Sequence, residues 1–250
     1  MTPSPIGFGA FKIGRNESIK YPHAYDLPPE QDVHRLLNAV LDAGINVIDT
    51  APAYGMSEER IGRAIAHRRD AFILSTKVGE DFLHGVSTYD YTRDAVRASV
   101  HRSLRRLRTD VLDLVFIHAN RHDQDILQTT DVVETLLALR DHGVTRGIGL
   151  SGYTEPACRA ALTWADAVMV TYHRDDVSLA PIIDEAAAAG VQVFVKKGLA
   201  SGRLAPDDAI PFVLGNPGVA CVVVGGLSIG HIRDNIRIAR RVRGNHLVGG

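Results

Sequence analysis

The feature that most constrains the fold of this chain is an alternation between short apolar runs of strand length and longer amphipathic stretches. The runs fall at residues 45–49, 72–77, 112–117, 145–150, 167–171, 191–195 and 219–224, with a weaker one at 6–11. They are apolar at nearly every position, as expected of parallel strands buried on both faces. Eight strands alternating with helices predict an α/β fold, a closed (β/α)8 TIM-type barrel. A doubly wound open sheet fits the same alternation and is the structural alternative.

The stretches between the runs have helical periodicity. Apolar residues recur at three- and four-residue spacing at Val33, Leu36, Leu37, Val40 and Leu41, and again at Val96, Val100, Leu104 and Leu107. Each stretch therefore has one apolar face that can cover a sheet. Three predicted helices end at a glycine before a strand, at Gly44, Gly143 and Gly190, where glycine permits the left-handed turn that reverses the chain.

The composition narrows the class of protein. The chain has 250 residues, 45% of them hydrophobic and 23% charged, with a net charge of -1. We expect residues 1–250 to form a single domain, because an α/β barrel takes roughly 200–250 residues. The near-zero charge gives no reason to expect nucleic acid or a membrane surface as a partner, and no apolar stretch approaches the ~20 residues of a membrane span. We expect a cytoplasmic protein in which Cys158 and Cys221 are reduced; the sequence does not indicate an oligomeric state.

Four residues that can handle protons stand at the ends of consecutive predicted strands. Asp49 closes the second strand, Tyr54 follows in its loop, Lys77 closes the third strand, and His118 closes the next. The C-terminal ends of barrel strands meet at one rim, so these side chains are expected to converge. A phenol with a pKa of ~10 is a poor proton donor at neutral pH, but a nearby ammonium favours the phenolate. An acidic residue can hold that ammonium in place.

These residues lie in motifs that resemble the aldo-keto reductase family, namely Asp49-Thr-Ala-x-x-Tyr54-Gly, the Lys77 segment and Leu112-Asp-Leu-Val-Phe-Ile-His118. The resemblance covers most of the chain and implies an NAD(P)H-dependent oxidoreductase that reduces an aldehyde or ketone to an alcohol, or catalyses the reverse. It makes Tyr54 the general acid/base, with Lys77 lowering its pKa, Asp49 orienting Lys77, and His118 orienting the carbonyl. The chemistry agrees, because hydride transfer leaves charge on the carbonyl oxygen, which needs hydrogen bonds and then a proton.

The same resemblance implies a cofactor site along the later strands. The segment at 149–152 resembles the one that binds the nicotinamide carboxamide, residues 196–202 the loop along the pyrophosphate, and residues 225–235 the segment at the adenosine end. The implied cofactor-binding residues are Ser151, Gly152, Lys196, Gly198, Leu199, Gly202, Gly225, Ser228, His231, Asp234 and Asn235.

Four positions depart from the family pattern. Gly152 and Met169 stand where an asparagine and a glutamine often contact the carboxamide, and Lys196 replaces a tyrosine that often stacks on the nicotinamide ring. His231 falls where an arginine frequently binds the 2′-phosphate of NADP. Nearby Arg233 and Arg237 can supply that charge, although a solvated helix face explains them equally well. The expected cofactor is NADP, with NAD as the alternative.

Two motifs have competing interpretations. The segment Gly147-Ile-Gly-Leu-Ser-Gly152 matches the dinucleotide fingerprint of open sheets, but its glycines lie inside a predicted strand rather than between a strand and a helix. The segment His118-Ala-Asn-Arg-His122, followed by Asp123 and Asp125, suggests a metal site, but it leaves a strand and its histidines do not share a helical face. We therefore expect neither an open nucleotide-binding sheet nor a metal.

The substrate is the least constrained part of the prediction. Aromatic residues of two predicted loops, Tyr21 and Tyr25 before residue 28 and Phe82, Tyr89 and Tyr91 after the third strand, overhang the rim. They pack either on an apolar or sugar-like substrate or on one another. The sequence ends at His246-Leu-Val-Gly-Gly, soon after the last predicted helix, so we expect an open and permissive site for a small carbonyl compound or alcohol.

Two other functions use the same residues. One is a non-redox biosynthetic enzyme that catalyses a dehydration or rearrangement in the same site. The other is a non-catalytic, NADP-sensing regulatory subunit, which no predicted partner helix or extension supports. The sequence does not separate the non-redox enzyme from the reductase.

Overall fold

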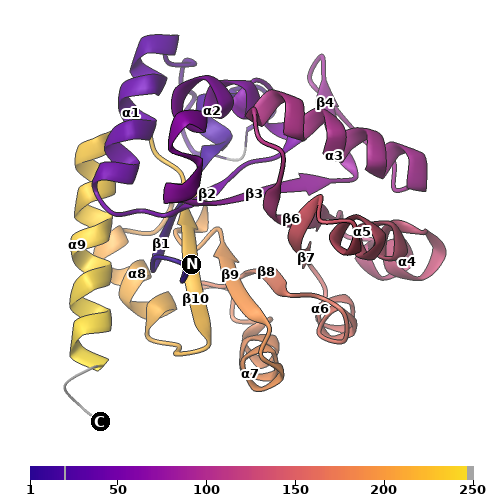
Figure 1. The fold of residues 1–250 in the computed structure, drawn as a ribbon. Helices are drawn as coiled ribbons and strands as arrows, with labels where there is room; N and C mark the ends of the chain where they lie inside the picture. The colour runs from indigo at the N-terminus through magenta and orange to yellow at the C-terminus, as the bar shows by residue number, and fades with distance from the viewer. Residues whose placement is uncertain (20, 247–250) are drawn as a thin grey trace.

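The described residues, 1–19 and 21–246 of a computed structural model, form a closed barrel of eight parallel strands with helices around it (Figure 1). The strands follow the order β1, β10, β9, β8, β7, β6, β3, β2 around the barrel. Their bounds are β1 Ile6–Gly9, β2 Val47–Asp49, β3 Ile73–Val78, β6 Leu112–His118, β7 Thr145–Ser151, β8 Ala167–Thr171, β9 Gln192–Lys196 and β10 Val219–Val224. Each predicted run overlaps one of these strands, so the TIM-type barrel is confirmed and the open sheet is excluded.

The helices cover the outside of the barrel. They are α1 Glu30–Asp42, α2 Ser57–Ile65, α3 Arg93–Leu107, α4 Asp123–Thr129, α5 Val132–Asp141, α6 Glu155–Ala161, α7 Ala180–Ala189, α8 Pro206–Leu214 and α9 Ile229–His246, with 3-10 turns η1 Ala10–Ile13, η2 Pro52–Tyr54, η3 Ala66–Ala71 and η4 Ala200–Gly202. The last helix, α9, lies beside α1, as the left side of Figure 1 shows. The glycines that follow α1, α5 and α7 have φ of 94°, 74° and 74°, which confirms the predicted left-handed ends.

The inside of the barrel is filled by side chains, which separates its two ends. The rings of Phe116 and Phe194 meet edge to face there, with 5.9 Å between their centroids. At Gly149 a Cβ atom would lie 2.2 Å from the carbonyl oxygen of Ala167 and against the Phe116 ring. This glycine of the G-x-G-x-x-G segment therefore allows close packing inside β7, and α6 begins only at Glu155.

A β-hairpin after β3 was not predicted. Its strands are β4 (Glu80–Leu83) and β5 (Val86–Tyr89), and they pair antiparallel outside the barrel. The two turn residues, His84 and Gly85, have φ of 50° and 80°, the signs of a type I′ turn, whose twist suits a two-residue hairpin. The sequence-based prediction of a loop was wrong here because the strands are short and add no long apolar run.

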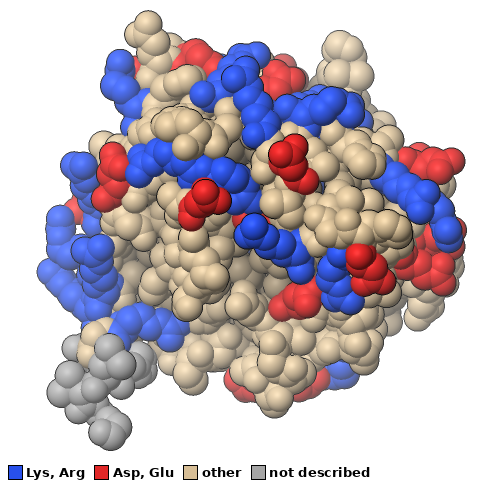
Figure 2. Space-filling model, in the orientation of Figure 1, with Lys and Arg blue, Asp and Glu red and all other residues tan. Residues whose placement is uncertain are grey.

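Charges of both signs are interspersed over the face of the molecule in Figure 2, with lysine and arginine side chains gathered at the edge formed by α9. Among the described residues, no helix has both the length and the apolar character needed to cross a membrane. Residues 247–250, on which the expectation of an open site partly rests, lie outside the described residues.

Candidate active site at the C-terminal rim of the barrel

Lys77 and Asp49 form a buried ion pair at the ends of two adjacent barrel strands. Lys77 Nζ lies 2.8 Å from each carboxylate oxygen of Asp49 and donates a further hydrogen bond to the carbonyl oxygen of Thr50, also at 2.8 Å. The two side chains are 1% and 4% exposed. Ser75 Oγ donates to Asp49 as well. The three protons of the ammonium are therefore all engaged, and both buried charges are compensated.

Tyr54 lies over this ion pair. It ends η2, the 3-10 turn that begins at Pro52, with two residues between it and β2. Lys77 Nζ lies 4.8 Å from the centroid of the Tyr54 ring. The ring meets Phe11 edge to face at 5.1 Å and His118 edge to face at 6.0 Å between centroids. These contacts fix the phenol at the wall of the cavity that His118 also lines.

Tyr54 is held in its protonated, neutral form. Burial raises the pKa of Tyr54 well above its ordinary value, and the negative charges of Asp49 and Glu80 act in the same direction. In the protein without ligands these effects outweigh any lowering of the pKa by Lys77, whose predicted contribution stays a prediction. Its charge is balanced by Asp49, and its protons go to Asp49 and Thr50, so none is left for the phenol oxygen. Tyr54 is a neutral hydrogen-bond donor over the neutral pH range.

His118, the last residue of β6, is paired with a carboxylate from the hairpin. Its Nδ1 lies 2.9 Å from Glu80 Oε2, in an ion-pair contact that lacks the alignment of a hydrogen bond. The two side chains are 14% and 13% exposed. Ser87 Oγ donates to the other Glu80 oxygen at 2.7 Å, and Tyr91 Oη donates to the His118 carbonyl oxygen at 2.8 Å. Both partners are thus fixed by neighbouring residues.

Glu80 is an anion at neutral pH. Burial acts to raise its pKa, but His118, Ser87 and Arg15 together outweigh burial and lower the pKa to about 2. Burial lowers the pKa of His118, and Glu80 opposes that shift. The carboxylate therefore supports the protonated imidazole in a site that otherwise disfavours it.

A cavity of about 390 Å³ joins these groups, within the size range of small-molecule sites. Of the residues predicted from the sequence, it is lined by Asp49, Tyr54, Lys77, His118, Ser151, Lys196 and Gly225. They come from the ends of β2, β3, β6, β7 and β9, from η2, and from the residue after β10. The structure thus brings together all four predicted proton-handling residues.

The other predicted cofactor residues do not line this cavity. Gly198 and Leu199 lie in the loop after β9, Gly202 ends η4, Ser228 precedes α9, and His231, Asp234 and Asn235 lie on α9. Gly152 follows β7, where a Cβ atom would lie 2.6 Å from Cys158 Sγ. Asp234 is ion-paired with Arg237 at 2.9 Å, which engages one of the cations considered for a 2′-phosphate.

The loop between Lys196 and Gly202 fits an anionic cofactor. Lys197, Ala200 and Ser201 have φ of 57°, 46° and 60°, a left-handed backbone that is costly for non-glycine residues and is found where ligands bind. Lys196 Nζ donates to Ser151 Oγ at 2.9 Å. Burial lowers the pKa of Lys196 to about 7, and the Lys197 charge acts in the same direction. Hydroxyl and amine donors at this place suit a carboxamide and phosphates, so the residues fit a pyridine nucleotide.

Several lining residues were missed in the sequence. Glu80 and Ser87 come from the hairpin, and Arg15 and Tyr153 also line the cavity, together with Tyr89, which the sequence had placed at the rim. A signal was present, because the pair His84-Gly85 separates two four-residue runs, the second rich in β-forming residues. Reading it as a hairpin turn places Glu80 opposite Tyr89, as the structure does.

The segment from His118 to Asp125, considered above for a metal site, contains a residue with a structural role. Both carboxylate oxygens of Asp123, which is fully buried, accept hydrogen bonds from Thr154 or the backbone of residue 153, so Asp123 holds the start of α6. In the described part of the chain, no three His, Cys, Asp or Glu residues are grouped so that they could hold a metal ion.

Sequence comparison relates this chain to the aldo/keto reductases. The model of the Aldo/keto reductase family matches residues 5–209. D-arabinose 1-dehydrogenase from Saccharomyces cerevisiae is 39% identical over 136 residues, which cover 51% of this chain and 38% of that protein. D-threo-aldose 1-dehydrogenase from Pseudomonas sp. is 31% identical over 185 residues, which cover 64% of this chain and 54% of that protein. The matches therefore span only about half, or less, of the length of these relatives.

Solved structures agree over almost the whole chain. A Pseudomonas aeruginosa protein assigned to the aldo-keto reductases has a TM-score of 0.90 and 38% identity, covering 97% of this chain and 92% of its own. The holo form of an aldo-keto reductase from Bacillus halodurans has a TM-score of 0.81 and 26% identity, covering 95% of this chain and 87% of its own. With the family model matching well over half of its residues, this chain belongs to the aldo/keto reductase family.

Proposed function

We propose that this protein is an NAD(P)H-dependent oxidoreductase that interconverts an aldehyde or ketone and its alcohol. The observation that carries the proposal is the single cavity lined by the buried Lys77–Asp49 pair, Tyr54 and His118. A redox step on a carbonyl needs hydrogen-bond donors for the oxygen and a group that exchanges its proton, and Tyr54 and His118 offer both.

The roles of these residues follow from their contacts. When bound, the nicotinamide cofactor supplies or accepts the hydride. The Tyr54 hydroxyl donates a hydrogen bond to the oxygen on which negative charge grows, and Lys77 beneath the ring favours that charge. Asp49 holds Lys77, and His118 faces the same oxygen from β6. Ser151, Lys196 and the loop up to Gly202 hold the cofactor.

NADP is the proposed cofactor, with NAD as the alternative. His231, Arg233 and Arg237 stand on the first turns of α9, where the family resemblance places the adenosine end. Since Asp234 engages Arg237, Arg233 is the main support for a 2′-phosphate. Binding of NADPH and NADH, measured by the fluorescence of the reduced cofactor, tests this choice. Arg233→Ala should weaken NADPH binding and leave NADH binding unchanged, whereas equal loss for both would contradict it.

The proposed substrate class is a small aldose or related hydroxyaldehyde. Two similar proteins are named aldose dehydrogenases, and the cavity wall adds the hydroxyl groups of Ser87, Tyr89 and Tyr153 and the charges of Arg15 and Glu80. Such groups can hydrogen-bond sugar hydroxyls, and aromatic faces can pack against a sugar ring. The cytoplasmic location remains a prediction from the sequence.

A direct test follows the absorbance of reduced nicotinamide with D-arabinose plus NADP or NAD, and with methylglyoxal plus NADPH or NADH. Steady change with one of these pairs is expected. Tyr54→Phe, with cofactor binding checked separately, is the control that ties the activity to this site. Conversion of substrate without an absorbance change would favour a non-redox enzyme. Tight cofactor binding without any turnover would favour a regulatory subunit.

A further inference from the structure

Lys196 is an amine in the wall of the cavity at the rim, and the proposed redox step uses it only to hold the cofactor. It ends β9, its side chain is partly buried, and its Nζ atom donates to Ser151 Oγ at 2.9 Å. The centroid of the Tyr153 ring lies 4.1 Å from Lys196 Nζ and 5.3 Å from Lys197 Nζ. Among the residues that the structure describes, no carboxylate lies within ion-pair distance of Lys196. A second amine therefore lies beside Lys196, and no counter-charge is in contact with it.

Lys77 lines the same cavity in a different state. Asp49 and Thr50 accept all three of its hydrogen bonds at 2.8 Å, so Lys77 is held as an ammonium, whose nitrogen has no lone pair. Lys196 donates one hydrogen bond, to a hydroxyl that a neutral amine can serve as well as an ammonium. The contacts thus require a charge on Lys77 and do not require one on Lys196.

The surroundings of Lys196 favour its neutral form. Burial lowers the pKa of Lys196 to about 7, the charges of Lys197 and Lys77 act in the same direction, and Asp123 and Cys158 oppose them. At pH 7 about half of Lys196 is then neutral amine, against less than about one part in 10³ of a lysine with the ordinary pKa of ~10.4. The charged and titratable groups that face Lys196 are Lys197 after β9, Lys77 from β3, His118 from β6, Tyr153 after β7, Asp123 from α4 and Cys158 from α6.

A neutral amine in a cavity that can admit a small carbonyl compound is a nucleophile. We propose that Lys196 of the cofactor-free protein forms a reversible Schiff base with small aldehydes. The lone pair of Nζ forms a bond to the carbonyl carbon, the π electrons move to the oxygen, and one proton passes from nitrogen to that oxygen. The hydroxyl group then leaves with the remaining N–H proton as water, and the C=N bond forms. No redox partner takes part, and addition of water reverses each step.

The other groups of the cavity suit this addition. Tyr54, a neutral hydrogen-bond donor, lines the same cavity and can donate to the oxygen on which charge grows as the amine attacks. The carbonyl oxygen thus meets the same kind of donor in the addition as in the proposed redox step.

Aldehyde capture and cofactor binding should exclude each other. In the proposed function Ser151 and Lys196 hold the cofactor, so an aldehyde bonded to Lys196 Nζ occupies part of that place. This exclusion rests on the proposed function, whereas the Schiff base itself does not. A bound cofactor therefore protects the lysine, and an aldehyde that arrives first delays the cofactor.

The first experiment identifies the lysine that reacts. The protein, freed of nucleotide, is incubated at pH 7 with glycolaldehyde and sodium cyanoborohydride, which reduces a Schiff base to a stable secondary amine. Peptide mass spectrometry then locates the adduct among Lys12, Lys20, Lys77, Lys196 and Lys197. We expect Lys196 to be modified at least about tenfold faster than Lys12, which packs over the rings of two loop tyrosines and does not line the cavity. Modification of any other lysine ahead of Lys196 would overturn the proposal.

Variants separate the capture from general reactivity. Lys196→Arg keeps a cation but has no amine that can form a Schiff base, so the fast adduct should disappear. Lys12→Arg is the matched control and should be modified at Lys196 at the wild-type rate. A fast adduct that persists in Lys196→Arg would contradict the assignment, and the mapping in the wild type stands whether or not this variant folds.

The second experiment tests the exclusion by the cofactor. NADPH at about ten times its Kd, with the aldehyde in excess, should slow the modification of Lys196 about tenfold, because about one molecule in ten then lacks the cofactor. The rate at Lys12 should not change. An undiminished rate at Lys196 with bound cofactor would refute the exclusion.

The two proposals fail in different ways. If the protein bound neither NADPH nor NADH but Lys196 were still trapped, the proposed function would fail and the Schiff base would stand. If the protein oxidised or reduced the carbonyl probes but Lys196 were not trapped, the Schiff base alone would fail.

Discussion

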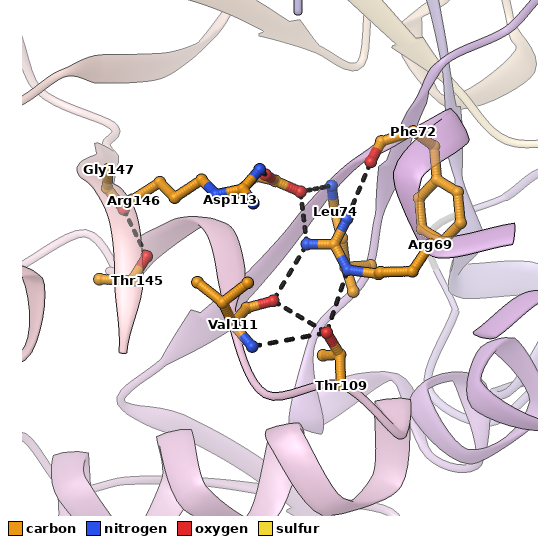
Figure 3. Close-up of polar contacts among 9 residues, drawn as sticks. All are labelled: Arg69, Phe72, Leu74, Thr109, Val111, Asp113, Thr145, Arg146 and Gly147. Carbon is orange, nitrogen blue, oxygen red and sulfur yellow. Dashed lines mark hydrogen bonds and ion pairs between the residues drawn. The ribbon is translucent and has the colours of Figure 1, made fainter. Parts of the chain in front are cut away.

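The two ends of the barrel each carry a partly or fully buried ion pair, but they differ in what surrounds it. At the N-terminal end Arg69 from η3 lies 2.6 Å from Asp113 of β6. Figure 3 shows that Arg69 also donates to the carbonyl oxygens of Phe72 and Val111, and that Asp113 also accepts from the Leu74 backbone. Arg146 and Thr109 complete this network. Its groups bond to one another, which is typical of a structural anchor.

At the C-terminal end the ion pair also has all of its hydrogen-bond partners, but two neighbouring polar groups lack theirs. Lys77 and Asp49 engage each other, whereas the Tyr54 hydroxyl and His118 Nε2 have no hydrogen-bond partner among the described residues. Both residues line the cavity, so a substrate can supply the missing partners. The reactive end is therefore distinguished by polar groups that lack a hydrogen-bond partner within the protein, and not by the presence of charge.

Cavity size alone would have pointed to the wrong end. A hollow of about 880 Å³ lies at the N-terminal face, larger than the cavity at the rim. The charged side chains that line it are Arg69, Asp70, Asp113, Arg140, Arg146 and Asp166, and all of them except Asp70 are ion-paired with another of the group. Most charged groups of this hollow are therefore already bound to one another and are not free to bind a ligand.

Breaking the ion pair at the reactive end should have the largest effect. Lys77→Met leaves the Asp49 carboxylate buried and uncompensated, so we expect the free energy of unfolding to fall by about 3–5 kcal/mol. Turnover should fall by at least about 10³-fold, because Tyr54 loses the charge beneath its ring. Urea unfolding and steady-state kinetics measure the two losses. Asp49→Asn combined with Lys77→Met should regain part of the stability and none of the turnover; recovery of turnover would contradict the assigned role.

Removing only the Tyr54 hydroxyl should lower the activity and leave the stability of the fold almost unchanged. For Tyr54→Phe we expect kcat/KM to fall by about 10²–10³-fold, the cost of losing one donor to a developing oxyanion. The free energy of unfolding should change by less than about 1 kcal/mol, because the hydroxyl has no partner in the described residues. Near wild-type turnover with intact cofactor binding would remove Tyr54 from the mechanism.

The N-terminal network should respond in the opposite way. Arg69→Met removes donors from several acceptors, and we expect a loss of about 2–3 kcal/mol in the free energy of unfolding. Activity per folded molecule should stay within about twofold of wild type, because the filled barrel separates the two ends. Arg35→Met is the control, since Arg35 pairs with Asp32 on the exposed face of α1 and should cost under about 1 kcal/mol. A large loss of turnover in folded Arg69→Met would show that the two ends are coupled.

The smallest expected effect is a pH dependence at the reactive end. The pKa of Lys196 is lowered to about 7, so between about pH 7 and pH 10 the unfolded chain holds a proton that the folded protein has lost. Stability contributed by this residue therefore rises with pH over that window. Lys196→Met removes this pH dependence, so its Tm should exceed that of wild type at pH 7, with the gain vanishing near pH 10. Parallel Tm curves for the two proteins between pH 7 and pH 10 would contradict this assignment.

The sequence predicted the barrel and the reactive rim because both depend on local patterns. Buried parallel strands such as β3 and β6 are long apolar runs, and strand ends fall at one rim once the barrel is accepted. The convergence of Asp49, Tyr54, Lys77 and His118 at one rim could therefore be predicted from their places in the chain.

Two properties of the site depend on tertiary contacts and could not be predicted in this way. The pKa of Tyr54 rises because the ring is buried and because the charges of Asp49 and Glu80 lie near it, and both effects depend on the folded structure. Glu80 acquires its partner only when the hairpin turns back over β6, and no pattern in the sequence links residues 80 and 118. The positions of the site residues follow from local patterns in the sequence, whereas their protonation states depend on tertiary contacts.

The hairpin that carries Glu80 is joined to β3 by one glycine. Gly79 has φ of 100°, and a Cβ atom there would lie 2.0 Å from the ring of Tyr91, whose hydroxyl holds the His118 carbonyl. Since β4 and β5 pair with each other and not with a barrel strand, substitutions in the hairpin leave the backbone pairing of the barrel unchanged. Substitutions in the β4–β5 hairpin can therefore change the pKa values of the site residues during evolution, as long as Gly79 is kept.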